Sequence, residues 1–131
     1  MSFVSDLFCT LAKIPSPSMH EDAVLDKIEE LLSSWGISNR RDECGNVYGC
    51  VEATDASKKS LAFSAHTDVV GDFSPVNLVF SKDGKTVGTD KTRTLGADDK
   101  AGVAAAYYTM YNISDGSYFI TEQFTGIMIP R

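Results

Sequence analysis

The sequence predicts an α/β domain, and three observations lead to that class. The chain has 131 residues, long enough for one domain that buries roughly two thirds of the surface exposed by its unfolded form. Segments whose apolar residues recur at helical spacing alternate with short runs that favour strands. Hydrophobic residues make up 43% and charged residues 23% of the chain, as in soluble globular proteins. One hydrophobic core is therefore expected.

Two amphipathic helices are expected in the amino-terminal third of the chain. Apolar residues recur at helical spacing from Phe3 to Ala12, and the pattern stops at the proline-containing segment 14–17. A second helix begins after Ser18, with acidic residues in its first turn, where the helix dipole favours negative charge. Gly36 ends this helix, because glycine readily adopts the left-handed conformation of a helix cap.

Two strands are expected next, and the second of them leads into a histidine. Residues 47–53 follow a turn at 44–46 and alternate enough in polarity to form a strand. Residues 61–65 form a short and almost wholly apolar run, which is typical of a central strand covered on both faces. His66 follows this run directly.

The second half of the chain is expected to add a hairpin, a helix and two short strands. Residues 77–87 contain an Asp83-Gly84 turn between strand-like runs, which indicates a peripheral hairpin. Residues 99–113 are rich in alanine and carry apolar residues on one face, so a third helix is expected there. Two further apolar runs, 118–121 and 124–129, are typical of strands.

Charge and hydropathy argue against several classes of protein. The formal net charge is −6, and no cluster of lysine and arginine is longer than a pair, which argues against binding to nucleic acid. No apolar run approaches the roughly 20 residues of a membrane-spanning helix. The amino terminus lacks the basic and apolar regions of a signal peptide, so a cytoplasmic location is the default expectation.

The first cluster that points to chemistry is Ser64–Asp68, at the expected carboxyl end of the apolar strand. That end of an α/β sheet is where functional sites form. The neutral imidazole of His66 is a good zinc ligand, and Asp68 is placed to accept a hydrogen bond from its other ring nitrogen. A His-x-Asp triplet is common, however, and a single histidine after a strand is more often a hydrogen-bonded structural residue. This triplet alone leaves both interpretations open.

The second cluster, Gly96–Gly102, places two adjacent carboxylates before the expected third helix. Glycine there allows close backbone approach, and a carboxylate can bridge two metal ions through its two oxygens. Asp98 or Asp99 could instead cap the helix, which stabilises it by about 1 kcal/mol. Two acids followed by Lys100 exceed what a cap requires, yet this segment alone does not decide between the two roles.

The two clusters occur together in the order found in zinc metallopeptidases, and the chain resembles the peptidase T kind with its carboxypeptidase and deacylase relatives. Gly96–Gly102 is especially similar to the peptidase T branch. The resemblance covers residues 3 to about 113. Residues 1–131 therefore look like the amino-terminal part of a metallopeptidase catalytic domain, with a divergent end at 114–131. Further similar segments are Leu11–Ser18, Asp42–Val47 and Ser64–Val70.

This resemblance implies both a fold and a site. The fold is a three-layer αβα domain with a mixed sheet and helices on both faces, of which this chain provides the first half. By the resemblance His66 would bind one zinc ion, Asp98 would bridge two zinc ions, and Asp68 would lie behind His66 as the catalytic aspartate. Asp99 and Lys100 match the motif but receive no ligand role.

The resemblance also implies groups that this sequence does not contain. The similar enzymes take a general-base glutamate from a Glu-Glu pair beyond the third helix, and a later aspartate and a distal histidine complete their metal sites. After Asp115 the only acidic residue is Glu122, and the only histidines are His66 and His20, the latter expected at the surface. We therefore expect negligible peptidase activity from this chain alone.

The expected function is that of a zinc-dependent exopeptidase of the tripeptide aminopeptidase kind, which hydrolyses short peptides with two zinc ions in the complete enzyme. An N-acyl amino acid deacylase or a carboxypeptidase is open within the same chemistry. A function of a different class is also open, namely a non-catalytic fragment or pseudoenzyme that binds metal or serves as an assembly partner. Its partners would be further copies of the chain or a missing second half on another polypeptide.

Overall fold

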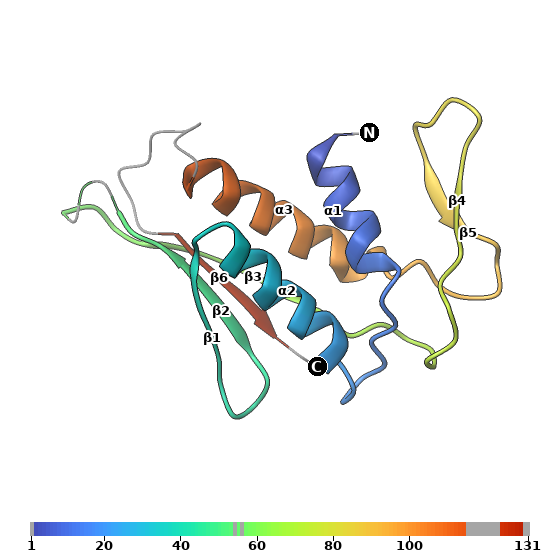
Figure 1. The fold of residues 1–131 in the computed structure, drawn as a ribbon, viewed down its shortest axis with the longest axis horizontal. Coiled ribbons are helices and arrows are strands. Elements are labelled where there is room, and N and C mark those ends of the chain that lie inside the picture. Colours follow the sequence, from blue (N-terminus) through green and yellow to red (C-terminus); the bar gives the residue numbers. More distant parts are fainter. Residues whose placement is uncertain (1, 54, 56, 115–123, 130–131) are drawn as a thin grey trace.

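The chain forms helices packed on a mixed β-sheet, with a separate hairpin (Figure 1). The structure, a computed structural model, describes residues 2–53, 55, 57–114 and 124–129. The α/β class and the mixed sheet predicted from the sequence are confirmed. In chain order the elements are α1 (Phe3–Ala12), α2 (Asp22–Ser34), β1 (Ser38–Arg41), β2 (Val47–Val51), β3 (Leu61–His66), β4 (Leu78–Phe80), β5 (Val87–Thr89), α3 (Ala97–Ser114) and β6 (Phe124–Ile129).

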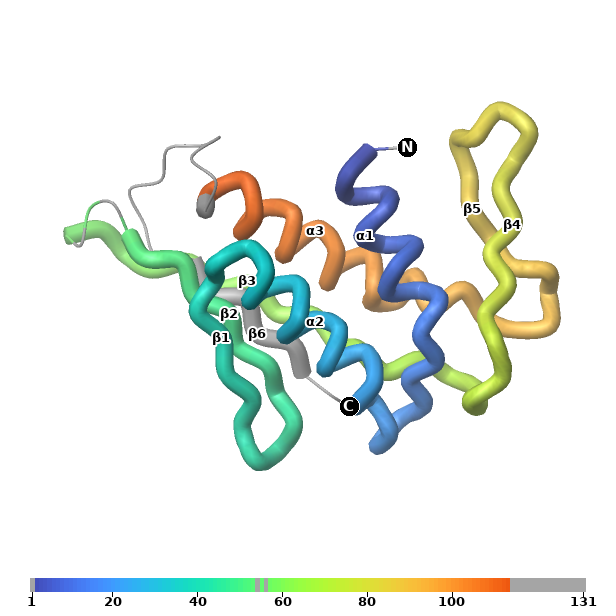
Figure 2. The backbone as a smooth tube through the Cα atoms, viewed as in Figure 1, coloured from blue at the N-terminus to red at the C-terminus, as the bar shows by residue number. Residues whose placement is uncertain are grey.

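The main sheet has the strand order β1-β2-β6-β3. The pairs β1–β2 and β2–β6 are antiparallel, whereas β6 runs parallel to β3. Strands β4 and β5 form a sheet of their own, and their hairpin projects from one end of the molecule (Figure 2). Residues 67–96 thus leave the end of β3, form this hairpin and return to the start of α3.

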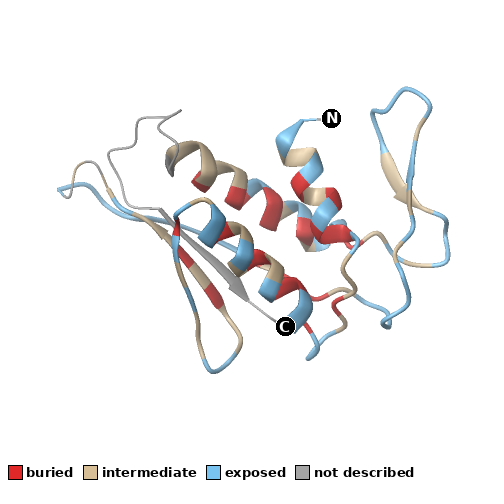
Figure 3. Ribbon diagram, viewed as in Figure 1, coloured by how far each residue is buried: buried red, intermediate tan, exposed pale blue. Residues whose placement is uncertain are grey.

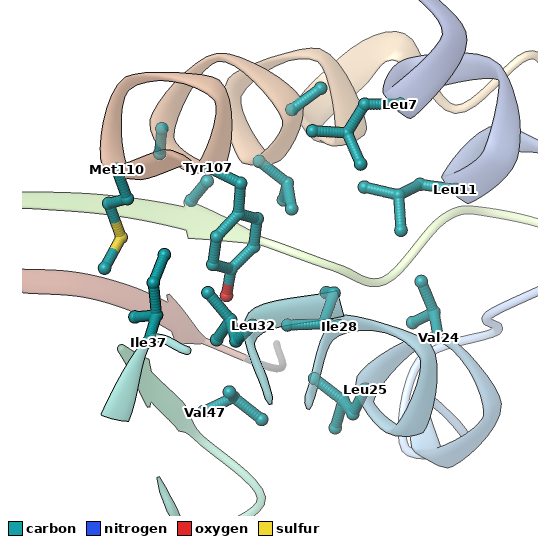
Figure 4. Close-up of a cluster of buried hydrophobic side chains, with 14 residues drawn as sticks. Leu7, Leu11, Val24, Leu25, Ile28, Leu32, Ile37, Val47, Tyr107 and Met110 are labelled. Carbon is teal, nitrogen blue, oxygen red and sulfur yellow. The ribbon is translucent and has the colours of Figure 1, made fainter. Parts of the chain in front are cut away.

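The helices share one hydrophobic core with one face of the sheet (Figure 3, Figure 4). A methyl group on Gly49 of β2 would contact Leu32 of α2 at 3.2 Å and Met110 of α3 at 2.9 Å, so these two helices cover the same face. Of the three layers that the resemblance implies, the described residues supply these two. Burial of a leucine side chain stabilises a fold by roughly 1.5–3 kcal/mol. The fully buried apolar side chains include Leu11, Val24, Leu25, Ile28, Leu32, Val47, Val103 and Met110.

Both amino-terminal helices begin and end close to where the sequence predicts. α1 begins after the N-cap residue Ser2 and ends before the proline-containing segment. The turn after α2 is made by Gly36, whose φ is 71°. The backbone N–H groups of Gly36 and Ile37 donate to the carbonyl oxygens of Ser33 and Leu32, at 3.0 and 2.9 Å. This pair of hydrogen bonds is the Schellman arrangement, which requires a left-handed residue at that position.

The prediction that residues 61–65 form a central strand covered on both faces is wrong for the described structure. β3 lies at the edge of the sheet that the described residues form. Leu61 and Phe63 keep 45% and 40% of their surface exposed, and only Ala65, near the carboxyl end of the strand, is buried. An apolar run is compatible with burial on two faces, but the described helices contribute to one core.

Strand β1 was not expected, because its sequence is polar and carries no strand pattern. It pairs with β2, and its last residue, Arg41, lies against α2 with Nη2 2.6 Å from Asp26 and from Glu29. Burial lowers the pKa of the Arg41 guanidinium, but hydrogen bonds to these two carboxylates outweigh that effect and raise the pKa. Tertiary pairing therefore overrides local propensity in this segment.

The hairpin predicted around Asp83-Gly84 is confirmed as β4 and β5, and residues 124–129 form β6 as predicted. The strand predicted at 118–121 lies outside the described residues. None of the helices in the described part of the chain has the length and hydropathy that crossing a membrane requires.

Candidate metal centre

The end of β3 and the start of α3 meet, and this brings two predicted site residues together. His66 is the last residue of β3, and Asp98 follows 32 positions later at the start of α3. His66 Nε2 lies 3.0 Å from Asp98 Oδ1. The contact depends on tertiary structure, because the whole β4–β5 hairpin lies between the two residues in the chain.

Gly96 allows the two segments to approach this closely. Its φ is 71°, in the left-handed region that glycine adopts without strain. A methyl group on its Cα would lie 2.7 Å from Cγ2 of Val69, well inside van der Waals contact. A side chain at position 96 would therefore push the start of α3 away from the loop that follows β3.

Asp99, rather than Asp98, caps the helical part of α3. Both residues have non-helical backbone angles, and the peptide bond between them is cis. Asp99 Oδ1 accepts a hydrogen bond from the Gly102 N–H at 3.1 Å, three residues along, as in an N-cap. The Asp98 side chain is 88% exposed and faces His66. The cap is thus separate from the carboxylate that meets the imidazole.

Asp68 lies behind His66, on the side of the ring opposite Asp98. His66 Nδ1 is 3.0 Å from Asp68 Oδ1 and 3.2 Å from the Asp68 carbonyl oxygen. The Asp68 side chain is 7% exposed, and its Oδ2 accepts a hydrogen bond from Ser18 Oγ at 2.5 Å. A carboxylate behind a metal-binding imidazole fixes the orientation of the ring. Ser18 was not predicted to belong to the site, and its only signal was its place in the segment Leu11–Ser18.

The imidazole of His66 therefore has a carboxylate oxygen 3.0 Å from each ring nitrogen. A neutral imidazole carries one N–H, and the hydrogen-bond acceptors beside its two nitrogens are the Asp68 carbonyl oxygen at Nδ1 and Asp98 Oδ1 at Nε2. When Nδ1 carries the proton, Nε2 directs a lone pair at the Asp98 carboxylate. A lone pair and a carboxylate oxygen at this distance repel each other unless a proton or a metal cation lies between them. Asp68 is buried on the Nδ1 side, so His66 Nε2 and the exposed Asp98 carboxylate are the two groups free to face a cation.

Lys100 joins the start of α3 to the connector between α1 and α2. Its side chain is almost fully buried, with 2% exposed, and Nζ donates to the Ile14 carbonyl oxygen at 2.5 Å. Burial, with a smaller contribution from the positive charge of Arg93, lowers the Lys100 pKa to about 8. The lysine of the motif thus has a structural contact and no direct part in the His66–Asp98 pair.

The described residues supply only part of a metal site. Zinc is usually held by three or four protein ligands, and no group of three His, Cys, Asp or Glu side chains suited to a metal occurs within residues 2–53, 55 and 57–114. His20 is exposed, as predicted, and its ring packs against Phe73 with centroids 5.6 Å apart. Glu122 lies outside the described residues. The candidate ligands are therefore His66 and Asp98.

The sequence is similar to that of a bacterial dipeptidase. The cytosol non-specific dipeptidase of Escherichia coli K12 is 32% identical over 111 residues, covering 77% of this chain and 23% of that protein. The chain spans about a quarter of the length of the curated relatives that it matches. No family model matches the chain.

Solved structures with low sequence identity share the fold. Aminopeptidase PepT from Bacillus cereus has a TM-score of 0.84 at 20% identity, covering 95% of this chain and 35% of that one. The YXEP protein of Bacillus subtilis, described as a dinuclear metal binding peptidase from the M20 family, has a TM-score of 0.62 at 16% identity, covering 97% and 34%. At these identities the likeness establishes the fold alone. This chain therefore has the fold of part of an M20 family peptidase.

Proposed function

We propose that this chain is the amino-terminal part of a zinc-dependent exopeptidase of the tripeptide aminopeptidase kind. The observation that carries the proposal is the approach of His66 Nε2 to 3.0 Å from Asp98 Oδ1, with Asp68 on the other ring nitrogen. In this proposal His66 binds one zinc ion and Asp98 bridges it to a second. Asp68 holds the imidazole in the required orientation.

The donor atoms present fit such an ion. Imidazole nitrogen suits zinc, and a carboxylate suits a pair of divalent cations because each oxygen can bind one of them. When bound, zinc would polarise the scissile carbonyl group of the substrate and lower the pKa of a bound water. The exposed Asp98 carboxylate keeps its second oxygen accessible, as a bridging role requires.

A short peptide as substrate is supported by the names of the similar proteins, a dipeptidase and an aminopeptidase. The proposed reaction is hydrolysis of the peptide bond at the amino end of such a peptide. Deacylation of an N-acyl amino acid and carboxypeptidase activity use the same metal chemistry and stay within the proposal as variants. A cytoplasmic location goes with it, since the Escherichia coli relative is named a cytosolic enzyme.

A second candidate is a metal-binding chain without catalytic activity of its own, which serves as an assembly partner. One observation favours it: the described residues offer no third metal-binding side chain at the site. In this candidate the chain binds metal without turnover of its own.

Zinc binding to the full chain tests the site that both candidates share. Competition with a chromophoric chelator should show that His66→Ala weakens binding by more than about 100-fold, beyond the usual effect of an outer-shell loss. Asp98→Asn should weaken it by about 10-fold or more. His20→Ala removes the other histidine and should bind zinc as the wild type does. Unchanged affinity in a folded His66→Ala variant would contradict the site.

Hydrolysis of a tripeptide by the zinc-loaded chain tests whether these 131 residues are active by themselves. We expect negligible turnover from these residues alone, because among the described residues the site has only the His66 and Asp98 side chains to offer a metal. Turnover that His66→Ala abolishes and His20→Ala leaves unchanged would show that the chain is catalytically complete. The second candidate would then be excluded.

A further inference from the structure

The connector between α1 and α2 lies against the loop that follows β3. Ser16 makes two hydrogen bonds with this loop. Its Oγ donates to the Thr67 carbonyl oxygen at 2.7 Å, and its carbonyl oxygen accepts from the Val69 N–H at 2.8 Å. Ser16 and Thr67 are both buried. The connector is therefore fixed to the backbone on either side of Asp68.

Two residues further along the connector, Ser18 contacts the Asp68 side chain. Ser18 Oγ donates to Asp68 Oδ2 at 2.5 Å. The other oxygen, Oδ1, faces His66 Nδ1 at 3.0 Å. Each oxygen of the carboxylate thus has its own neighbour, which limits rotation about a terminal torsion that is otherwise broad.

This contact matters for His66 because Nδ1 has a second acceptor within reach. The Asp68 carbonyl oxygen lies 3.2 Å from Nδ1. Nδ1 is hydrogen-bonded to this neutral oxygen, and the carboxylate oxygen Oδ1, 3.0 Å from Nδ1, adds a negative charge beside the ring without a hydrogen bond of its own. If the carboxylate turned away, the imidazole would keep its tautomer but lose this adjacent charge. Loss of the carboxylate behind a ligating imidazole typically weakens metal binding by about 10- to 100-fold.

The same connector also contacts the segment that carries the other candidate ligand. Lys100, two residues after Asp98, donates to the Ile14 carbonyl oxygen at 2.5 Å. Both ligand-bearing segments therefore form hydrogen bonds with residues 14–18. This short stretch holds the two sides of the site at a common position.

We propose that Ser18 is a positioning residue: its hydroxyl holds the Asp68 carboxylate against His66 Nδ1 and so strengthens metal binding at His66 Nε2. The inference rests on the proposed function, because it concerns the same site. By this inference, an exposed serine that lies far from His66 and Asp98 in the sequence contributes measurably to the metal affinity of the site.

Zinc affinity of two Ser18 variants of the full chain, measured by competition with a chromophoric chelator, tests the inference. Ser18→Ala should bind zinc about 10-fold more weakly, whereas Ser18→Thr, which keeps the hydroxyl, should stay within about 2-fold of the wild type. Ser57→Ala is the matched control, because Ser57 Oγ donates to Asp55 Oδ1 at 2.7 Å on an exposed loop. Its zinc affinity should equal that of the wild type.

The Nδ1 proton of His66 gives a second readout, which needs no metal. In proton spectra of the metal-free chain, a carboxylate oxygen 3.0 Å from Nδ1 should place this resonance further downfield than the bond to the neutral Asp68 carbonyl oxygen would alone. Ser18→Ala should therefore move it upfield, and Ser18→Thr should restore it. Circular dichroism should be the same for all variants, which separates this effect from a loss of folding.

The outcomes distinguish the inference from the proposed function. Wild-type affinity in Ser18→Ala, with an unmoved Nδ1 resonance, would overturn the positioning role and leave the metal site in place. An equal loss of affinity in Ser18→Thr and Ser18→Ala would also overturn it, because the hydroxyl would not be the responsible group. Unchanged zinc binding in His66→Ala would instead overturn the proposed function, and the inference with it.

Discussion

The two ends of β3 differ in how the surrounding chain encloses them. At the carboxyl end Ala65 is buried, and so is Asp68 just beyond the strand. At the amino end Leu61 and Phe63 stay substantially exposed. The difference arises because the connector between α1 and α2 and the start of α3 both reach the carboxyl end, as their hydrogen bonds and close contacts show.

A site can therefore be built on one enclosed end of an otherwise open strand. Asp68 is held by hydrogen bonds from the connector, and Asp98 reaches His66 because Gly96 permits close backbone approach. Burial of the whole strand is not required. Changes in the short segments at the enclosed end should therefore have larger effects than changes along the exposed part of β3.

Substitution at Gly96 should have the largest effect, because it pushes apart the two segments that meet at the enclosed end. Gly96→Ala should lower the free energy of unfolding by about 2–5 kcal/mol, combining the cost of a left-handed alanine with overpacking against Val69. Gly84 is the matched control, since its φ is 67° and nothing lies within 4 Å of the added methyl group. Gly84→Ala should cost only about 1–2 kcal/mol. Urea unfolding followed by circular dichroism measures both, and equal losses would mean that position 96 is not tightly enclosed.

The stability of the chain should depend on pH, because the enclosed end contains the buried Lys100. The Lys100 pKa is lowered from 10.5 to about 8 by burial. Between these values the unfolded chain holds a proton that the folded chain has lost, so the free energy of unfolding should increase as pH rises. The increase is roughly 3 kcal/mol over the whole interval, at about 1.36 kcal/mol per pKa unit.

Lys100→Met should remove this increase in metal-free protein, and urea unfolding between pH 7 and 10.5 measures the difference from the wild type. Other titrating groups contribute to both proteins and cancel in that difference. Lys82→Met, on the exposed hairpin, should leave the increase in place. A wild-type chain and a Lys100→Met variant with the same pH dependence would show that the ammonium group is hydrated rather than enclosed.

Features set by neighbours in the chain could be predicted from the sequence. The prolines after Ala12 and the glycine at position 36 fix helix ends by local conformational preferences, and both helices form as predicted. His66, Asp68 and Asp98 could be selected by residue type and by resemblance, and the structure brings them together. Their roles toward a metal stay predictions.

Features that depend on distant partners could not be predicted. Ser18 meets Asp68 across 50 positions of sequence, and no local pattern marks that contact. β1 is a strand because it pairs with β2 and because Arg41 forms an ion pair with Asp26 of α2. The exposure of β3 was also missed, because an apolar run does not reveal how many faces its neighbours cover.

Substitution at the open end of β3 should have the smallest effect. Leu61→Thr should cost less than about 1 kcal/mol, because a side chain that is 45% exposed loses only part of its burial energy and threonine favours strands. Leu11→Thr, at a fully buried position of the same residue type, should cost about 3 kcal/mol or more. Urea unfolding at two protein concentrations measures both changes. The contrary outcome is that Leu61→Thr costs as much as Leu11→Thr while the unfolding midpoint of the wild type rises with protein concentration. In that case the open end of β3 is covered by another copy in solution, and the contrast between the two ends holds only for the isolated chain.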